Sequence, residues 1–568
     1  MQVLNRNLGK KGKVLLVSLS VVFLSLGLFS FSETDFKIAK NIDIFVTLFR
    51  EVNMLYVDGT DPEELIESSI TGMLESLDPY TTYIPEKDMD DFKFMTTGKY
   101  GGIGALIRKA GGYTIISEPY EGFPAQRNGL HAGDTLITIN GVSTLEKQIS
   151  DVSELLKGNP NTPLTLEVKR LGVDSLLKFK FDREQVTIPN VPYYGIIEEG
   201  VGYIVLSNFM KNAGKEVKAA YNNLREQGAT SIILDLRSNP GGLLDEAVNI
   251  SNIWVGKDEE IVSTKGKVKQ WDKSYLTNTN PVDTTMPVVV LVNRASASAA
   301  EIVAGSLQDL DRAVIIGQKT FGKGLVQTTR PLSYNSHLKI TTAKYYIPSG
   351  RCIQALDYSH RNEDGSVGKV PDSLISEFKT RNGRSVFDGG GIDPDIKIEG
   401  QSPGNITMSL YAQSLLFDYA TVYATEHESI PKAAYFEITD EMYADFKHFL
   451  SDKEFEYSTK SSEKLSDLIK TAKYEGYYDK VEDQLNALEV QLHGDRDLDL
   501  ETFSKEIKEL LKDEIVSRYY YQKGRIEAGI GNDPEITKAI DILSDKETMM
   551  SILHGSYEGE TVFAFMTH

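Results

Sequence analysis

Apolar and polar residues follow different periods along the chain, and the changes of period divide it into segments. Apolar residues recur every three or four positions between residues 36 and 97, where Asp78-Pro79-Tyr80 interrupts the pattern. Between residues 401 and 568 the pattern is again mainly helical. We therefore predict helical regions at 36–97 and at 401–568, the second with an amphipathic face formed by Leu500, Phe503, Ile507, Leu510, Leu511 and Ile515.

Residues 98–186 have the pattern of a small β-rich module. Segments 113–116, 134–139 and 164–168 are predicted strands, and Asn140-Gly141 is a strong signal for a tight turn. Short helices are expected at 124–128 and 149–156. The run Gly101-Gly102-Ile103-Gly104 opens the module.

Residues 187–400 alternate between strand and helix patterns. Strands are predicted at 201–206 and 231–236, with a helix at 215–227 between them. Segment 287–292 is an unbroken apolar run, typical of a strand buried on both faces, and a helix pattern follows at 297–307. This alternation predicts a layered α/β domain, and the polar stretch 357–389 is expected to be an irregular insertion. The fold class is thus multidomain α+β.

Residues 1–35 carry the pattern of an export segment. A basic start is followed by residues 14–31, which carry no charge. This stretch of 18 residues lies between the usual lengths of a cleaved signal peptide and a membrane span. We expect an uncleaved anchor in the inner membrane and a periplasmic protein, with a cleaved signal peptide as the alternative.

Composition narrows the function further. The formal net charge of −21 argues against a broad nucleic-acid-binding surface. Cys352 is the single cysteine, so no intramolecular disulfide forms. The sequence has no His-Glu-x-x-His motif, and we expect neither a metal nor another cofactor.

The predicted strand-to-helix junction at 293–302 is filled with small residues and contains Ser296 and Ser298. The unpaired N–H groups and the dipole of a helix N-terminus stabilise the oxyanion that forms when a hydroxyl attacks a carbonyl. A nucleophilic serine would benefit from this position. By itself, however, such a run is more typical of packing and helix capping.

A second run, 317–327, places Lys323 between two glycines and beside apolar residues. A free lysine titrates at a pKa of ~10.4, too high for a base at neutral pH, but burial disfavours the charged form and lowers the pKa. A neutral amine can accept the proton of a serine, as in a serine–lysine dyad. If the run continues as a strand, Gln327 shares a face with Lys323 and can orient it. A solvated lysine in a surface turn is the alternative.

A third run, 234–244, ends a predicted strand in Asn239-Pro240-Gly241-Gly242. Glycines allow the backbone to approach a ligand closely. We expect the N–H of Ala299 to be one oxyanion donor and the N–H of Gly241 or Gly242 to be the other. An ordinary tight turn is the alternative.

These three runs, with a fourth at 342–351, resemble in order the sequence blocks of the carboxyl-terminal processing peptidases (tail-specific proteases) of serine peptidase family S41. The resemblance covers about residues 40–400 and implies a ClpP/crotonase-like protease core at 187–400. It implies that Ser298, three residues before a glutamate, is the nucleophile, that Lys323 is the base and that Gln327 orients it. Ser296 is a rival nucleophile that fits the spacing less well, and Asp309 is expected to be structural.

The same resemblance implies that residues 98–186 are a PDZ domain. Such a domain adds a peptide as an extra strand and holds its terminal carboxylate in a nest of backbone N–H groups. The nest is expected at Gly101, Gly102, Ile103 and Gly104. The implied partners are protein substrates read by their free C-termini, and an adaptor protein and a homodimer or higher oligomer are further expectations.

Two other functions compete with this interpretation. One is a non-catalytic ligand- or peptide-binding protein on the same fold, as in retinoid-carrying relatives, and the other is a crotonase-like acyl-CoA enzyme. A binding protein has no reason to keep Ser298, Lys323 and Gln327 at this spacing, and an acyl-CoA enzyme needs no PDZ domain or export segment. We therefore predict a serine endopeptidase that processes or degrades exported proteins.

Overall fold

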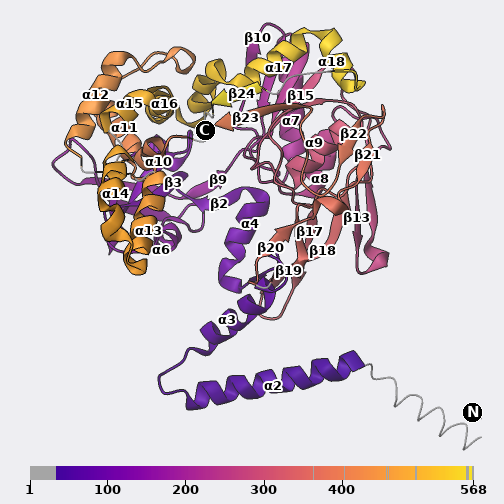
Figure 1. Cartoon of the computed structure of the whole chain (residues 1–568), viewed down its shortest axis with the longest axis horizontal. Coiled ribbons are helices and arrows are strands. Elements are labelled where there is room, and N and C mark those ends of the chain that lie inside the picture. Colours follow the sequence, from indigo (N-terminus) through magenta and orange to yellow (C-terminus); the bar gives the residue numbers. More distant parts are fainter. Residues whose placement is uncertain are drawn as a thin grey trace, which may run out of the picture. The chain divides into compact units, whose positions relative to one another are not determined.

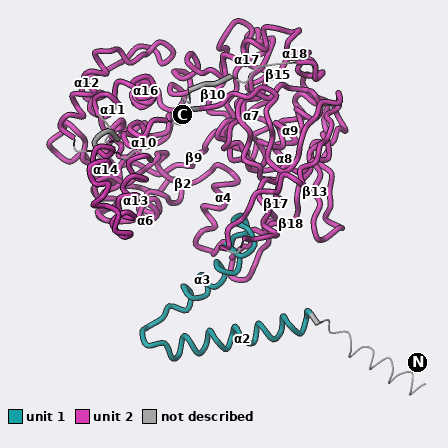
Figure 2. Tube along the Cα trace, in the orientation of Figure 1, with its two compact units in different colours: residues 1–83 teal, residues 84–568 magenta. Residues whose placement is uncertain are grey.

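The computed structural model describes residues 33–362, 364–401, 403–453, 455, 457, 460–492, 496–557 and 562–565. The chain divides into two compact units, residues 1–83 and 84–568, which Figure 2 colours separately. The predicted anchor at 14–31 lies outside the described residues. Among the helices that are described, none combines the length and the apolar character needed to cross a membrane.

The first unit contains two helices and a short strand in its described part. Asp61 caps the second helix, because its carboxylate accepts a hydrogen bond from the N–H of Glu63 at 2.8 Å. After this helix, the carboxylate of Asp78 accepts hydrogen bonds from the N–H groups of Tyr80 and Thr81 and forms the predicted break. The elements are α2 (Glu33–Leu55), α3 (Pro62–Glu75) and, at the boundary between the units, β1 (Thr82–Ile84).

A β-rich module lies at the start of the second unit, after η1 (Glu86–Asp88) and α4 (Met89–Thr97). Its main sheet has the order β3-β4-β5-β7-β8 with β6 paired to β5, and β2 pairs separately with β9. The elements are β2 (Lys99–Gly102), β3 (Ala105–Ala110), β4 (Tyr113–Pro119), α5 (Pro124–Arg127), β5 (Thr135–Ile139), β6 (Val142–Ser143), α6 (Ile149–Leu156), β7 (Pro163–Lys169), β8 (Leu177–Asp182) and β9 (Glu184–Thr187).

The local predictions for this module are confirmed. Asn140 and Gly141 join β5 to β6, and both have the positive φ that this tight turn requires, 50° and 79°. Val152 of α6 shares one buried core with Ile116 and Leu136 of the sheet. β8 and β9 extend the module beyond the predicted strands.

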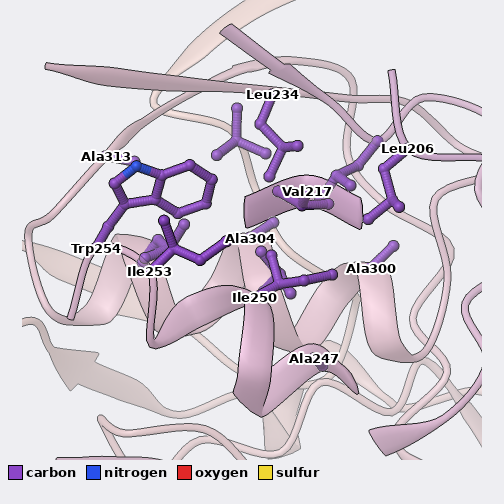
Figure 3. Close-up of a cluster of buried hydrophobic side chains, with 14 of the residues drawn as sticks. Leu206, Val217, Leu234, Ala247, Ile250, Ile253, Trp254, Ala300, Ala304 and Ala313 are labelled. Atoms are coloured by element: carbon purple, nitrogen blue, oxygen red, sulfur yellow. The ribbon is translucent and has the colours of Figure 1, made fainter. Parts of the chain in front are cut away.

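An α/β core follows, and its sheet has the order β10-β11-β12-β15-β16-β23-β24. From β11 onward neighbouring strands are parallel, whereas β10 is antiparallel to β11. Helices α7, α8 and α9 pack on this sheet, and Figure 3 shows Leu234 of the sheet near Val217, Ile250 and Ala304 of the helices. The predicted layered α/β domain is confirmed. Its elements are β10 (Tyr193–Glu198), β11 (Val201–Val205), α7 (Ala213–Glu226), β12 (Ser231–Asp235), α8 (Leu244–Ser251), β15 (Val288–Val292), α9 (Ala299–Asp309), β16 (Val314–Gly317), β23 (Ile396–Gln401) and β24 (Val562–Phe565).

A second, antiparallel sheet pairs β18 with β17 and with β13, and β13 with β14. The stretch 357–389, predicted to be irregular, instead forms two short hairpins, β19–β20 and β21–β22. Gly365 and Gly383 lie in the turns of these hairpins at φ of 81° and 89°. Glycines that permit tight turns allow hairpins to form here, although the polar composition predicted irregular structure. The elements are β13 (Glu260–Gly266), η2 (Lys269–Trp271), β14 (Lys273–Leu276), β17 (Leu325–Pro331), β18 (His337–Tyr346), β19 (Leu356–Arg361), β20 (Val367–Lys369), η3 (Asp372–Leu374), β21 (Glu377–Lys379) and β22 (Ser385–Phe387).

Most of the predicted C-terminal helical region forms a domain with its own core. Leu500, Ile507, Leu511 and Ile515 of the predicted amphipathic face are buried in it. Figure 1 shows these helices in orange and yellow beside the β-rich module. The elements are α10 (Asn405–Ala412), α11 (Leu415–Glu426), η4 (Ala433–Tyr435), α12 (Asp440–Ser451), α13 (Lys460–Glu475), α14 (Tyr478–Leu492), α15 (Arg496–Thr502) and α16 (Ser504–Gly529).

The end of the chain packs elsewhere. After η5 (Ile530–Asn532), α17 (Pro534–Ser544) and α18 (Lys546–Leu553) place Ile536 and Ile552 in one core with Ile233 and Val289 of the α/β sheet. β24 then pairs with β23 of the same sheet. Residues 401–568 are therefore not one packing unit, because the last helices cover the face of the sheet that α7, α8 and α9 leave open.

Candidate active site

The three runs predicted to carry chemistry meet at the carboxyl ends of parallel strands β12, β15 and β16. The N–H of Ala297 donates to the carbonyl of Asn239 at 2.9 Å, and the N–H of Phe321 donates to the carbonyl of Ser296 at 3.0 Å. The N–H of Gln318 also donates to the carbonyl of Val292 at 3.0 Å. Segments far apart in the sequence thus form one loop cluster, at the edge of the sheet where α/β proteins bind their ligands.

Ser298 is the N-cap residue of α9, and its backbone is strained. Its φ of 57° and ψ of −114° are unusual for a residue with a side chain. Ser298 is partly exposed, whereas Ser296 is fully buried. The hydroxyl of Ser296 donates to the carbonyl of Leu236 at 2.7 Å and accepts from the N–H of Asn293 at 2.9 Å. Ser296 therefore serves as a tie between two loops, and Ser298 is the serine with an accessible position.

A buried carboxylate, Glu301, joins the serine and lysine runs. Its Oε2 accepts hydrogen bonds from the N–H groups of Ser298 at 2.8 Å and of Lys323 at 2.9 Å. Its Oε1 accepts from the hydroxyl of Thr320 at 2.5 Å and the N–H of Gly322 at 2.7 Å. Burial raises the pKa of Glu301, and these hydrogen bonds oppose the rise. In the sequence Glu301 is only a landmark for the nucleophile, and nothing near it shows that it contacts the lysine run.

Tyr345 forms a second connection between the same two residues. Its buried hydroxyl lies 2.6 Å from the carbonyl oxygen of Lys323 and 3.2 Å from that of Ser298. Burial holds the pKa of Tyr345 well above its usual range, so the group stays a neutral donor. Tyr345 belongs to the run at 342–351, which the resemblance includes but for which no role is predicted.

Lys323 is half-buried between two glycines that tolerate no side chain. A Cβ on Gly322, whose φ is 86°, would lie 2.4 Å from the Cβ of Ala355, and one on Gly324 would lie 2.8 Å from the backbone nitrogen of Gln354. The flanking glycines therefore let the lysine run pack closely against 354–355. This close packing explains the predicted Gly-Lys-Gly pattern.

The premise that placed Gln327 on the same strand face as Lys323 is wrong. β17 begins at Leu325, after the lysine, and its pairing with β18 shifts register between Val326 and Gln327. The extra residue of this shift is Thr342 of β18, whereas the alternation of β17 does not extend to Lys323, so even spacing does not determine a common face. The amide Nε2 of Gln327 donates to the hydroxyl of Thr341 at 3.1 Å.

The two glycines predicted as alternative oxyanion donors, Gly241 and Gly242, differ in whether their N–H groups are engaged. The N–H of Gly241 donates to Oδ1 of Asn239 at 2.8 Å, so it is engaged. In the part of the chain that the structure describes, the N–H groups of Gly242 and Ala299 have no acceptor. A Cβ on Gly241, whose φ is 90°, would lie 2.8 Å from the Cβ of Ser298. The glycine is therefore needed for the loop to approach the serine.

Arg237, in the same run, connects the loop to the C-terminal segment. Its guanidinium pairs with Asp235 at 2.6 Å, with Asp533 at 2.6 Å and with Glu535 at 2.5 Å, all of them buried or nearly so. Burial raises the pKa of Glu535 to about 7, since one guanidinium faces three carboxylates. α17 thus contributes to holding the strand end from which the glycine run leaves.

Asp309 is structural, as predicted. Its carboxylate pairs with the buried guanidinium of Arg351 at 2.7 Å and accepts from the N–H of Ser349 at 3.0 Å. It therefore fixes the end of the 342–351 run and makes no recorded contact with Ser298 or Lys323.

The predicted carboxylate nest of the β-rich module is only partly formed by the four residues expected. Gly101 and Gly102 belong to β2 and pair with β9, and Ile103 is buried. Gly104, at a φ of 73°, turns the chain into β3. The backbone N–H groups of Gly104 and Ala105 lower the pKa of the Tyr100 hydroxyl, against the stronger opposite effect of burial. Of the four expected residues, Gly104 is the one beside the Tyr100 hydroxyl, and the N–H of Ala105 follows it.

Strand β3 forms one end of the sheet of this module and lies against α6. Ala105 and Ile107 face the core that includes Val152 and Leu156 of α6. An edge strand beside an apolar helix is the arrangement that accepts an added peptide strand.

Comparison with known proteins agrees with this organisation. The family model "Peptidase family S41" matches residues 200–359, "PDZ domain" matches 115–170, and "Probable PDZ-protease, C-terminal helical domain" matches 406–543. The chain is 36% identical over 342 residues to the carboxy-terminal-processing protease of Bartonella bacilliformis, covering 60% of this chain and 76% of that protein. It is 33% identical over 306 residues to the carboxy-terminal processing protease CtpA of Bacillus subtilis, covering 54% of this chain and 65% of that protein.

Solved structures give weaker matches. The photosystem II D1 C-terminal processing protease shares 29% identity at a TM-score of 0.32, covering 55% of this chain and 89% of that one. The PDZ domain of a carboxy-terminal protease from Vibrio cholerae, in complex with a peptide, shares 28% identity at a TM-score of 0.15, covering 16% of this chain and 99% of that one.

Proposed function

The chain belongs to the carboxy-terminal-processing proteases of peptidase family S41 and is a serine-type peptidase; from this premise we propose that Ser298 is its nucleophile and Lys323 its general base. The observation that carries the proposal is the double contact of Glu301, whose Oε2 accepts from the backbone N–H groups of both residues. A shared acceptor keeps the two backbones about two hydrogen-bond lengths apart.

The proposed reaction is an acyl transfer in two steps. The neutral amine of Lys323 takes the proton of the Ser298 hydroxyl as its oxygen attacks the scissile carbonyl, and the resulting ammonium protonates the leaving amine. Water then attacks the acyl-enzyme, Lys323 accepts the proton of the water, and the ammonium returns it to the Ser298 oxygen as the acyl group leaves as a carboxylic acid. The unpaired N–H groups of Gly242 and Ala299 are proposed to stabilise the oxyanion in both steps, each worth ~3 kcal/mol.

Gln327 remains in the proposal as a positioning residue. Because Nε2 of its amide donates to Thr341, the amide oxygen is the atom proposed to accept a hydrogen bond from the Lys323 amine. Gln327→Ala is then expected to shift the pH profile of cleavage, and Gln327→Glu, whose carboxylate favours the charged ammonium of Lys323, is expected to move the profile to higher pH.

We further propose that the PDZ domain selects substrates by their free C-termini. The support is β3, an edge strand beside α6, and the donor pair of Gly104 and Ala105 at its start. In the proposed complex the substrate tail pairs with β3, and its terminal carboxylate replaces the Tyr100 hydroxyl at these N–H groups. The added strand would carry the chain toward Ser298 for cleavage.

Location and assembly rest on sequence alone. The basic start and the uncharged stretch at 14–31 support an exported, periplasmic enzyme that is anchored to the inner membrane or released from a signal peptide. Its substrates would then be exported proteins. An adaptor protein and a homodimer or higher oligomer remain proposals drawn from the family.

The dyad is tested with an unfolded substrate carrying a C-terminal tag. Ser298→Ala and Lys323→Ala should each abolish cleavage while the circular dichroism spectrum and melting temperature stay near those of the unsubstituted protein. Ser296→Ala is the matched control, and although it removes a buried tie it should retain measurable cleavage. Loss of activity in Ser296→Ala together with activity in Ser298→Ala would show that the nucleophile is misassigned.

The tail-reading step is tested with the substrate. Amidating its C-terminus removes the charge that the Gly104 and Ala105 donors are proposed to bind, so cleavage should slow. Equal rates for the acid and the amide would exclude recognition of the terminal carboxylate. Comparing the termini of exported proteins in strains with and without Ser298→Ala would then identify the natural substrates.

A further inference from the structure

A pocket of about 340 Å³ lies where the PDZ domain meets the C-terminal helical domain. Its walls come from β3 and β4 on one side and from α10, α11 and α16 on the other, and charged side chains are prominent among them. The lining residues are Leu106, Arg108, Ser117, Glu118, Tyr411, Ala412, Ser414, Leu416, Phe417, Glu514, Arg518 and Arg525.

Arg108 lacks a carboxylate partner in this pocket. Its Nη1 donates to the hydroxyl of Ser414 at 2.7 Å, and its guanidinium carbon lies 3.6 Å from the centre of the Phe417 ring. Its Nε and Nη2 are buried and have no hydrogen-bond partner among the described residues. These two nitrogens form one edge of the guanidinium, the edge that binds both oxygens of a carboxylate.

The other arginines of the pocket are already paired. Arg525 contacts Glu118 at 2.5 Å, and Arg518 contacts Glu514 at 3.1 Å. The carboxylates of Glu514 and Asp418 also act on Arg108 electrostatically, but neither forms an ion pair with it in the described structure. Nε of Arg518 is also buried without a partner, but its Nη2 donates to the carbonyl of Phe417 at 3.0 Å. Among the described arginines that line the pocket, Arg108 is therefore the one with both nitrogens of its carboxylate-binding edge unfilled.

The position of Arg108 on β3 determines which residue of a bound tail lies beside its guanidinium. Leu106 and Arg108 alternate with Ala105 and Ile107, which face the core beside α6. Arg108 and the pocket therefore lie on the face of the sheet opposite α6. In an antiparallel peptide strand whose carboxylate binds at Gly104 and Ala105, the last residue lies opposite Ala105 and the residue three positions earlier lies opposite Arg108.

We propose that Arg108 selects substrate tails with an aspartate or glutamate three positions before the C-terminal residue. The acidic side chain enters the pocket from the edge of β3, and its two oxygens accept hydrogen bonds from Nε and Nη2 of Arg108. Phe417 and Ser414 hold the guanidinium from the helical domain, which thereby becomes part of the recognition site. This inference rests on the proposed reading of substrate C-termini by the PDZ domain.

The test measures binding of fluorescent ten-residue peptides with an apolar C-terminal residue to full-length Ser298→Ala protein by fluorescence anisotropy. One peptide has glutamate three positions before the end and its twin has glutamine there. The glutamate peptide should bind about tenfold more tightly, as expected for charge-assisted hydrogen bonds. A second pair of peptides carries glutamate or glutamine two positions before the C-terminal residue, where the side chain faces α6. This pair should show no preference for glutamate.

Variants of the protein assign the preference. Arg108→Gln should reduce the tenfold difference to less than twofold, whereas Lys180→Gln should leave it unchanged. Lys180 is an exposed lysine on β8, at the other edge of the same sheet, and so controls for loss of one positive charge. Melting temperatures of both variants verify that they fold. The comparison of the twin peptides on Ser298→Ala protein, with Arg108 unchanged, does not depend on either variant.

The outcomes separate this inference from the proposed function. If amidation of the C-terminus weakens both twins but they bind equally, Arg108 does not read the tail and the PDZ proposal stands. If neither twin depends on a free C-terminus, the tail-reading function itself fails. If free glutarate raises the melting temperature of the unsubstituted protein but not of Arg108→Gln, while the twins bind equally, the pocket takes a free carboxylate and the assignment to a substrate tail is overturned.

Discussion

The loops around Ser298 and the loop that opens the PDZ domain both bring backbone N–H groups together, but they hold them differently. Around Ser298, a buried carboxylate accepts from three backbone N–H groups and one hydroxyl. In the PDZ domain, the N–H groups of Gly104 and Ala105 act on a neutral tyrosine hydroxyl, that of Tyr100. The first set is bound to a charge inside the protein, and the second to a weaker acceptor.

This difference fits the two proposed tasks. Hydrogen bonds to a charged acceptor are roughly twice as strong as those between neutral groups, so the loops around Ser298 are held in one arrangement. Catalysis benefits from such fixed geometry. A neutral hydroxyl can be replaced by a ligand carboxylate that forms stronger bonds with the same donors. The contrast therefore suggests a preformed site for cleavage and an exchangeable one for recognition.

Removing the buried charge should have the largest effect. Glu301→Ala leaves four donors without this acceptor, and the two that are fully buried, Thr320 and Gly322, each cost ~1–3 kcal/mol. We expect kcat/KM to fall about 100-fold or more and the free energy of unfolding to drop by several kcal/mol, measured by peptide cleavage and urea denaturation. Glu441→Ala, at an exposed helix position, is the control. Unchanged kcat/KM in Glu301→Ala would mean that the carboxylate does not hold the dyad in place.

Adding one carbon beside the serine tests how closely the loops are fixed. In Gly241→Ala the new Cβ would lie 2.8 Å from both the Cβ of Ser298 and the backbone nitrogen of Ala299. We expect kcat/KM to fall about tenfold, equivalent to ~1.4 kcal/mol. Gly228→Ala is a matched control, since Gly228 has a similar φ of 97° and nothing within 4 Å of a Cβ. Equal kcat/KM for the two variants would show that the close approach is unimportant.

The pH dependence of stability tests the charge cluster around Arg237. Burial raises the pKa of Glu535 to about 7, above the ordinary value of 4.5 that it regains on unfolding. Between these two values the folded state holds a proton that the unfolded state has lost, so stability falls as pH rises from about 4.5 to 7. Glu535→Gln should flatten this part of the profile, by at most about 3 kcal/mol. Urea unfolding at several pH values measures it, and an unaltered slope would contradict the raised pKa.

The smallest effect is expected in the PDZ domain. Tyr100→Phe removes the hydroxyl whose pKa the Gly104 and Ala105 N–H groups lower, so a tail carboxylate no longer competes with it for these groups. We expect peptides to bind a few-fold more tightly in fluorescence anisotropy, with Tyr113→Phe as the control on β4. Weaker binding by Tyr100→Phe would instead mean that the hydroxyl contacts the tail, and the contrast between a fixed and an exchangeable loop would be lost.

The sequence predicted local elements well where pattern and turn chemistry agreed. Asn140-Gly141 and the apolar run of β15 are examples, since a tight turn and a fully buried strand each have a distinct composition. The strand-face argument for Gln327 does not hold because β17 begins at Leu325, after Lys323, and β18 carries an extra residue opposite Val326 and Gln327. A bulge leaves no signal in alternating residues. Gly101 and Gly102 of the predicted nest belong to a strand, which glycine content alone does not reveal.

By itself the sequence determined the order of the domains, the family, and the three runs in which a nucleophile, a base and oxyanion donors are expected. Only the tertiary structure decided what joins them. Glu301, Tyr345 and Arg237 contact partners from other segments. α17 packs on a sheet in which every strand except β24 lies far earlier in the chain. Periodicity and turn signals report on neighbours a few residues apart. Contacts between distant segments depend on how packed elements bring them together, and no local pattern contains that information.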